Sequence, residues 1–231
     1  MQGNTRTRPP RQPITIVHLQ TIVRHIRNSD IIYHDQLLIV SAITLAFFGL
    51  LRSSEYTAPS GNTYDPSVTL LFSDITFSVN QTVAFINIKS SKTDPFKIGV
   101  TIRVGATNTE CCPVHALLCF INCHNYRSGP LYTFSDGTFL TRNYVSNLLH
   151  RLWPGINIDT HSFRIGGASS AAAAGVADST IQLLGRWSSN AYRRYIRVPD
   201  QAIVNTAVLM CSATCLNRIW DTDLCRSSSY P

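Results

Sequence analysis

The longest apolar run of the chain, Leu37–Leu51, constrains the fold more than any other segment. Ser41 and Thr44 interrupt this run and Arg52 ends it, so it is shorter than the roughly 20 residues that a membrane span needs. A segment that is apolar on all sides must be covered by the rest of the protein. The sequence therefore predicts a buried helix from about His34 to Ser53.

Apolar spacing elsewhere predicts helices towards both ends of the chain and a small sheet between them. A first helix begins after Thr15, where apolar residues recur every three or four positions as far as Ile26. Apolar and polar residues then alternate, as in half-buried strands, over three stretches: 75–79, 83–88 and 98–104. Helical spacing returns at Pro113, Thr141, His161, Asp178 (the expected cap of a short helix), Ala191 and Gln201. The predicted fold class is mainly α (α+β), with a small three-stranded antiparallel sheet.

Composition divides the chain into three parts. Residues 1–13 are basic and proline-rich, and we expect a flexible linker, because they lack the apolar stretch of a secretory signal. Residues 14–215 are expected to form one domain, since no boundary or internal repeat interrupts them. Residues 216–231 are expected to form a polar tail.

Charge and cysteine content limit the kinds of partner and site. Only 14% of the residues are charged, yet twenty Lys and Arg against thirteen Asp and Glu leave a net charge of +7. A basic excess on a globular domain indicates a polyanionic partner. The seven cysteines, an odd number without a secretory signal, are expected to be reduced thiols. Cys119, Cys123 and His124 could indicate a metal site, but the apolar residues around them favour buried thiols and no metal.

Several local features carry residue types that could perform chemistry, although each alone has an ordinary structural explanation. Arg52 is followed three residues later by Glu55, which can orient a guanidinium, but an arginine after an apolar helix is usually a surface residue. Lys92 lies between two predicted strands, where a solvated hairpin tip is the ordinary explanation.

The remaining features lie in the last third of the domain. His161 and Arg164 are three residues apart, so a helix would place them on one face, and the small residues 166–169 would let other backbone pack closely. Trp187 follows Gly185, which is expected to end a helix, and simple core packing could explain it. Tyr195 lies among arginines, whose positive charge favours the phenolate form, or it lies on an ordinary basic helix face.

Together these residues are sufficient for metal-free phosphoryl transfer. Two arginines can hold the non-bridging oxygens of a phosphodiester and offset the charge that grows in the transition state. A lysine can protonate a leaving alkoxide, a histidine can assist deprotonation, and a tyrosine can form the covalent link. The sequence has no Walker A loop, no HExxH motif and no carboxylate cluster of the kind that binds two metal ions.

The order of these residues resembles the tyrosine recombinase (phage integrase) family. The likeness covers about residues 14–200. Four motifs resemble most closely the recombinases of Crypton and DIRS mobile elements: SKTD, CPVHALL, THSFRIGGASSAAAAG and LGRWSSNAYRRYIR. The resemblance implies a site-specific DNA recombinase or integrase catalytic domain, which cleaves and rejoins strands through a 3′-phosphotyrosyl intermediate.

The resemblance also implies a role for each catalytic residue. Arg52 and Arg164 would hold the scissile phosphate, with Glu55 supporting Arg52. Trp187 would hydrogen-bond the phosphate and support the tyrosine. The proton-transfer and nucleophilic roles would belong to Lys92 (general acid for the 5′-hydroxyl), His161 (acid or base) and Tyr195 (nucleophile).

Two alternatives stay open within this assignment. Arg186, nine residues before Tyr195, could occupy the family position given to Trp187, although the GRW context favours the tryptophan. Tyr192 could replace Tyr195 as the nucleophile, although the YIR context favours Tyr195. Further basic residues are expected to contact DNA: Lys89, Arg186, Arg193, Arg194 and Arg197.

The family pattern also sets expectations for partners and organisation. The partner would be double-stranded DNA, bound by a homo-oligomer (a tetramer), without metal, cofactor, small-molecule substrate or membrane. The protein would be nuclear in a eukaryote or cytoplasmic in a bacterium, and not secreted. An N-terminal core-binding domain is expected to be absent, so that the chain is a fragment, a truncated copy or a domesticated descendant. The competing functions are a catalytically idle DNA-binding relic and a type IB topoisomerase-like enzyme.

Overall fold

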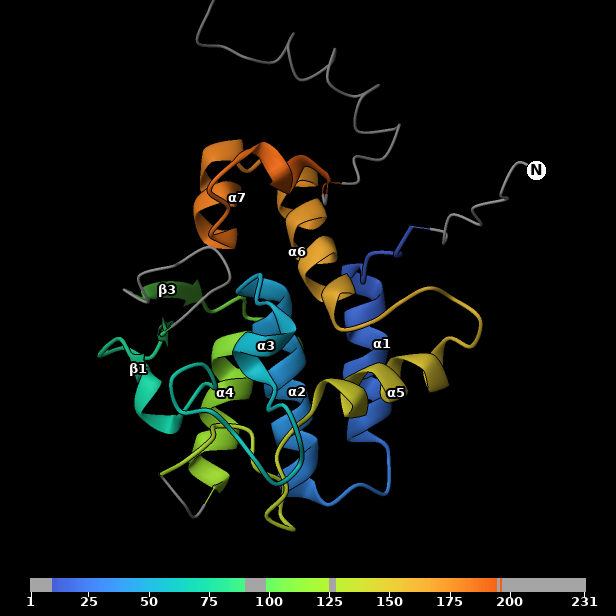
Figure 1. Ribbon diagram of the computed structural model, residues 1–231, viewed down its shortest axis with the longest axis vertical. Helices are drawn as coiled ribbons and strands as arrows, with labels where there is room; N and C mark the ends of the chain where they lie inside the picture. The colour runs from blue at the N-terminus through green and yellow to red at the C-terminus, as the bar shows by residue number, and fades with distance from the viewer. Residues whose placement is uncertain (1–9, 90–98, 125–127, 195, 197–231) are drawn as a thin grey trace, which may run out of the picture. The chain divides into compact units, whose positions relative to one another are not determined.

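The apolar run forms the long helix α2 (Tyr33–Phe48), against which several other helices of the domain pack (Figure 1). All residues from Leu38 to Phe47 are buried, which confirms the predicted buried helix. Helix α2 packs against α1 (Ile16–Arg27), α4 (Pro113–Cys123) and α6 (His161–Ala173). The computed structural model describes residues 10–89, 99–124, 128–194 and 196.

The remaining elements follow the predicted order of helices, sheet and helices. Residues 1–197 cluster as one unit, and residues 198–231 are a second unit that lies outside the described residues. The predicted helix at Gln201 and the predicted domain end at residue 215 therefore stay predictions. The elements not yet named are α3 (Ser53–Tyr56), η1 (Phe72–Asp74), β1 (Ile75–Phe77), β2 (Val83–Ile88), β3 (Val100–Gly105), α5 (Arg142–Leu152), α7 (Asp178–Gly185) and η2 (Asn190–Arg194).

The end of α2 differs from the prediction. The helix was expected to continue to Ser53, but it ends at Phe48, and Leu50 adopts a left-handed conformation with φ 47°. Leu50 and Leu51 are buried in the turn, so the apolar pattern continues although the helix has ended. As a result, Arg52 does not extend the long helix. It is the N-cap residue of the short helix α3 instead.

The sheet is the predicted three-stranded antiparallel meander, in the order β1–β2–β3. Ile86 pairs with both Ile75 and Ile102, and all three side chains are buried. This alternating apolar face joins the main core, where β3 packs against α4. The strands β2 and β3 run to Ile88 and from Val100, so the segment that contains Lys92 connects two paired strands.

Three helices begin at the residues that the sequence predicts. The side chain of Thr15 accepts a hydrogen bond from the backbone of His18 at the start of α1. The side chain of Thr141 does the same for Tyr144 at the start of α5, and Pro113 is the first residue of α4. Such caps satisfy backbone N–H groups that have no partner inside the helix.

The described cysteines are free thiols. Cys111 and Cys112 are buried, whereas Cys119 and Cys123 are partly exposed. A ring nitrogen of His124 lies 2.7 Å from one of His34, and the His124 ring stacks on Phe72. Across the described part of the chain, no three His, Cys, Asp or Glu side chains are arranged to hold a metal ion. Nor is any described helix long and apolar enough to cross a membrane.

Candidate active site

Arg164 lies inside the protein, one turn into α6, with 1% of its surface exposed. Its guanidinium donates hydrogen bonds to the backbone carbonyls of Leu50 and Gly185. The guanidinium carbon also lies 4.1 Å from the centre of the Trp187 ring, in a cation–π contact. Arg164 therefore joins α6 to the turn after α2 and to the end of α7.

The end of α7 explains how Trp187 reaches Arg164. A Cβ atom at Gly185 would lie 1.7 Å from the Trp187 ring, so only glycine leaves room for the indole. Gly185 is the last residue of the helix, as predicted, and Arg186 follows with a left-handed φ of 57°. Asp178 was expected to cap α7, but Ala177 occupies the cap position and Asp178 is the first helical residue. The carboxylate of Asp178 instead accepts a hydrogen bond from the hydroxyl of Tyr192.

Glu55 is buried between two arginines at the start of α3. Its Oε1 accepts a hydrogen bond from Nη1 of Arg52 at 2.9 Å, and its Oε2 accepts one from Nη2 of Arg186 at 2.6 Å. The backbone N–H of Arg52 also donates to Oε2, at 2.7 Å. The predicted contact between Glu55 and Arg52 is present. Arg186 is an additional partner that the sequence did not predict.

The carbonyl of Leu50 connects the two halves of this network. It accepts hydrogen bonds from both Arg164 and Arg186, the latter at 3.2 Å. Leu50 and Arg186 are both left-handed non-glycine residues, a conformation that costs about 1–3 kcal/mol each. Such backbone persists only where surrounding contacts fix it, and here these are the guanidinium bonds. The network thus holds the side chains of Arg52 and Arg164 near the same turn, the one that follows α2 at Leu50.

Two glycines bring α6 into backbone contact with the rest of the domain. A Cβ atom at Gly166 would lie 1.7 Å from the carbonyl oxygen of Ile14. One at Gly167 would lie 2.2 Å from the carbonyl oxygen of Phe47. The sequence predicted close packing at these small residues, and the structure confirms it. The position of Arg164, two residues earlier on the helix, depends on this fit.

His161 is the first residue of α6 and is partly buried. Burial lowers the pKa of its imidazole to about 4, and the positive charges of Arg164, Arg11 and Arg142 act in the same direction. The carboxylate of Asp159 opposes them. At neutral pH the imidazole is therefore uncharged, the form that accepts a proton.

Tyr192 belongs to a small apolar cluster beside Trp187. It is 2% exposed, and its hydroxyl donates a hydrogen bond to Asp178 at 2.9 Å. Its ring centre lies 6.0 Å from that of Trp187. Arg193 lies 3.6 Å from the same Asp178 carboxylate and is largely exposed, as is Arg194. Tyr192 is thus a packed residue with a bonded hydroxyl.

Three predicted site residues lie outside the described part of the chain: Lys92, Tyr195 and Arg197. Their roles stay predictions. Lys89, at the end of β2, is described, and its ammonium lies 2.8 Å from the carboxylate of Asp74. Arg186 was also predicted to contact DNA, but its side chain is only 6% exposed and its observed partners are within the protein.

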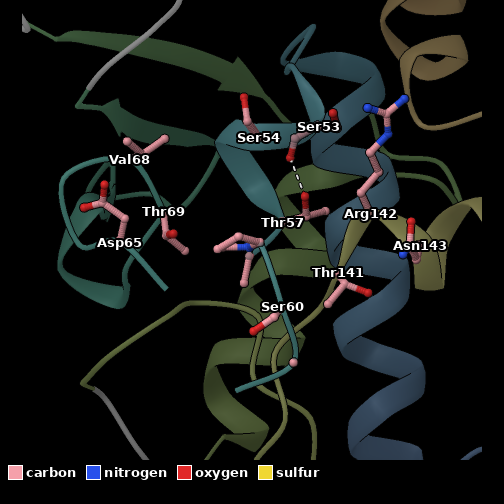
Figure 2. Close-up of a pocket in the computed structure, with 13 residues that line it drawn as sticks. Ser53, Ser54, Thr57, Ser60, Asp65, Val68, Thr69, Thr141, Arg142 and Asn143 are labelled. Carbon is pink, nitrogen blue, oxygen red and sulfur yellow. Dashed lines mark hydrogen bonds between the residues drawn. The ribbon is translucent and has the colours of Figure 1, made fainter. Parts of the chain in front are cut away.

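A cleft of about 750 Å³ lies beside α3, and its lining includes Ser53 and Ser54, which directly follow Arg52 in the chain (Figure 2). Ser53 of α3 and Thr57, the residue that follows this helix, lie on one side of the cleft, and Arg142 and Asn143 of α5 lie on another (Figure 2). Arg142 also pairs with Asp159, two residues before His161. The sequence alone did not indicate a role for Asp159, Arg142 or Arg11. An aspartate just before a helix start was the one available signal, since such residues often bind the first backbone N–H groups.

Comparison with solved structures identifies the fold. The XerH site-specific recombinase, in a post-cleavage complex with palindromic difH substrate, matches 91% of this chain with a TM-score of 0.62 and 16% identity. The Tn1549 transposon integrase in complex with circular intermediate DNA matches 87% of the chain, with a TM-score of 0.59 and 16% identity. This is the fold of the tyrosine recombinase catalytic domain.

A lambda integrase dimer bound to a COC′ core site extends this set of tyrosine recombinases, matching 83% of this chain at a TM-score of 0.56 and 16% identity. This chain spans 55% of the XerH chain, 68% of the Tn1549 integrase chain and 49% of the lambda integrase chain. No family model matches the sequence, and no curated protein sequence matches it. The predicted mostly helical fold with a three-stranded antiparallel sheet is confirmed.

Proposed function

We propose that this chain is the catalytic domain of a site-specific DNA recombinase, which cleaves and rejoins strands through a 3′-phosphotyrosyl intermediate. The observation that carries the proposal is the network that joins Arg52 and Arg164 through Glu55, Arg186 and the Leu50 carbonyl. Two fixed guanidinium groups within one network, beside an uncharged imidazole, suit a phosphodiester whose charge grows during reaction. The tyrosine recombinase fold supports the same reaction class.

In this proposal Arg52 and Arg164 bind the non-bridging oxygens of the scissile phosphate. Arg52 has 18% of its side chain exposed, so it can meet a phosphate as it stands. Arg164 is almost fully covered, and the Trp187 ring lies over its guanidinium. Phosphate binding therefore requires the indole of Trp187 to move off the guanidinium, while the carbonyls of Leu50 and Gly185 keep the orientation of Arg164.

The proton transfers follow from the remaining residues. Neutral His161 assists removal of the proton from the phenol of Tyr195, whose oxygen forms a bond to phosphorus. The bond from phosphorus to the 5′-oxygen breaks, and Lys92 protonates that oxygen. The 5′-hydroxyl of a second strand reverses these steps and rejoins the DNA. The energy of the broken bond is kept in the phosphotyrosine, so no high-energy cofactor is needed.

The described surroundings of Tyr192 support Tyr195 as the nucleophile. Tyr192 is buried, and its hydroxyl is bonded to Asp178. To attack a phosphate it would have to leave the apolar cluster and break that bond. Tyr195, three residues later, is the tyrosine of the YIR sequence that resembles the family motif.

In this proposal DNA contacts come from exposed basic residues and from the cleft beside α3. Arg193 and Arg194 are exposed next to the proposed nucleophile. The cleft offers hydroxyl, amide and guanidinium groups from Ser53, Asn143 and Arg142, which suit hydrogen bonds to a DNA strand. Lys89 and Arg197 remain proposed DNA contacts. For Arg186 the observed contacts favour a different role, in which it holds Glu55 and thereby Arg52.

The wider biology is proposed on motif likeness. The four motifs quoted above resemble those of Crypton and DIRS elements, and this resemblance supports a eukaryotic mobile-element recombinase that acts in the nucleus. Recombination would require a homo-tetramer on double-stranded DNA.

A covalent capture experiment tests the function. The purified chain is incubated with a pool of nicked oligonucleotides of random sequence, and the protein–DNA adduct is separated under denaturing conditions. An adduct is expected in the presence of EDTA, and Tyr195→Phe should abolish it. Tyr192→Phe is the matched control, which should keep the adduct.

Other outcomes separate the alternatives. An adduct that survives Tyr195→Phe and is lost with Tyr192→Phe would contradict the assigned nucleophile. A requirement for Mg²⁺ would contradict the mechanism. DNA binding without any adduct would support the idle relic, and relaxation of supercoiled DNA by a monomer would support the topoisomerase-like function.

A further inference from the structure

Asp159 makes contacts with three separate segments just ahead of the candidate general base. Its Oδ1 accepts a hydrogen bond from the backbone N–H of His161 at 2.8 Å. Its Oδ2 lies 2.8 Å from Nε of Arg11 and 3.5 Å from Nη2 of Arg142. Only 16% of the Asp159 side chain is exposed, so the carboxylate is largely enclosed by these partners.

Asp159 first fixes the start of α6. Besides the bond to His161, its carbonyl accepts the backbone N–H of Ser162 at 2.9 Å, and its own N–H donates to the Ser162 hydroxyl at 3.1 Å. These bonds satisfy N–H groups that the helix leaves without partners. They also fix the backbone that carries the imidazole.

Asp159 also holds two arginines from distant segments. Arg142 comes from the start of α5, and its side chain is 54% exposed. Arg11 precedes α1 and is 45% exposed. The segment after Arg11 is itself bonded to this region, because Gln12 donates to the carbonyl of Asn157 at 2.9 Å. Without a carboxylate partner, side chains this exposed would sample many rotamers in solvent.

We infer that Asp159 is a positioning residue, which holds the guanidinium groups of Arg11 and Arg142 beside the start of α6 and so sets the charge around His161. Asp159 contributes one negative charge and fixes two positive ones. The result is a small, defined positive field at the imidazole. As a statement about catalysis the inference rests on the proposed function, but the arrangement of charge can be tested without DNA.

The charged groups that act on His161 have opposing effects, which makes the arrangement measurable. Arg164, Arg11 and Arg142 lower the pKa of the imidazole, and Asp159 raises it. If Asp159 holds Arg11 in place, the effect of Arg11 must depend on Asp159. If other contacts hold Arg11 near His161, Arg11 must lower the pKa of the His161 imidazole equally with and without the Asp159 carboxylate.

The test is an NMR titration of His161 at low ionic strength in four proteins: wild type, Arg11→Gln, Asp159→Asn and the double variant. Asparagine keeps an oxygen for the His161 N–H but loses the charge. In the wild-type background Arg11→Gln should raise the titration midpoint by about 0.5 pH unit. In the Asp159→Asn background the same substitution should shift the midpoint by less than half as much.

A control variant tests whether the shift of the His161 midpoint is specific to Arg11. Arg151→Gln removes an exposed arginine from the same helix as Arg142 and should leave the His161 midpoint in place. If Asp159→Asn does not fold, Asp159→Ser retains a capping oxygen and replaces it. Equal shifts in the two backgrounds, or no shift with Arg11→Gln in the wild type, would overturn the inference.

A second readout separates this inference from the proposed function. The acid limb of the pH profile of adduct formation should move with the NMR midpoint in each variant. If the wild type forms no adduct, the proposed function fails and the titration still decides the role of Asp159. If the adduct forms and its pH profile ignores Arg11 and Asp159, the positioning role in catalysis is contradicted.

Discussion

Glu55 and Arg186 form a buried ion pair, with 2.6 Å between Oε2 and Nη2 and almost no exposed surface on either side chain. The two residues belong to α3 and to the turn after α7, so the pair joins segments far apart in the sequence. Burial lowers the pKa of Arg186, and the carboxylate of Glu55 opposes that shift. Each charge is therefore tolerated inside the protein because of the other.

Removing one member of this pair should be costly. Glu55→Ala leaves a buried guanidinium without its carboxylate and should lower the free energy of unfolding by about 3–5 kcal/mol, measured by urea denaturation. Glu110→Ala is a control, because it removes an ion pair with the exposed Arg24 and should cost much less. Equal losses in the two variants would show that the Glu55 pair does not hold α3 to α7.

The backbone contact at Gly166 makes a second prediction. Gly166→Ala adds a Cβ that would meet the carbonyl of Ile14, and it should destabilise the fold by at least about 3 kcal/mol in thermal or urea unfolding. Gly105→Ala is the matched control, because no atom lies within 4 Å of its added Cβ, and it should be nearly neutral. If Gly166→Ala is equally neutral, α6 does not approach the backbone as closely as described.

The lowered pKa of His161 makes stability depend on pH. Its folded-state value of about 4 lies below the ordinary 6.5, so between these values the unfolded chain binds more protons than the folded one. Stability should therefore fall as the pH is lowered from about 6.5 to about 4. His161→Gln should reduce that fall by about 1–2 kcal/mol after solvent screening. Urea denaturation at several pH values measures the free energy of unfolding of both proteins. If that free energy depends on pH in the same way in His161→Gln and in the wild type, the burial of the imidazole is contradicted.

The contact between Trp187 and Arg164 predicts a fluorescence change on DNA binding. A variant with Trp153→Phe and Trp220→Phe leaves Trp187 as the single tryptophan. If Arg164 binds the scissile phosphate as proposed, the phosphate displaces the indole from the guanidinium, and saturating DNA should change the emission of this variant. The matching variant that keeps only Trp153 should change much less. Tight binding with unaltered Trp187 emission would mean that Arg164 does not reach the DNA.

Much of the fold could be predicted from the sequence because its elements bury one regular face. The alternating residues of β2 and the helical spacing of α1 reflect such faces directly. The end of α2 could not be predicted in this way. Leu50 and Leu51 are as apolar as the helix before them, and the helix stops because Leu50 turns into a left-handed conformation that tertiary contacts hold.

The candidate site shows the same limit. Arg52, Glu55, His161 and Arg164 could be selected from residue type and order, and the contact of Glu55 with Arg52 is local in sequence. From the sequence, Arg186 resembles one more basic residue near the predicted nucleophile, Tyr195. Its burial depends on Glu55, 131 residues earlier in the chain, and no local pattern reports such a pairing.

The fit of Ile14 against Gly166 has a mechanical consequence. The backbone of Ile14 is hydrogen-bonded to Ser162, and its carbonyl lies in the notch that Gly166 leaves. Tension applied to the chain ahead of α1 would therefore load the helix of His161 and Arg164 directly, before it reached the apolar core. Helix α6 and the segment that precedes α1 therefore move as one rigid unit.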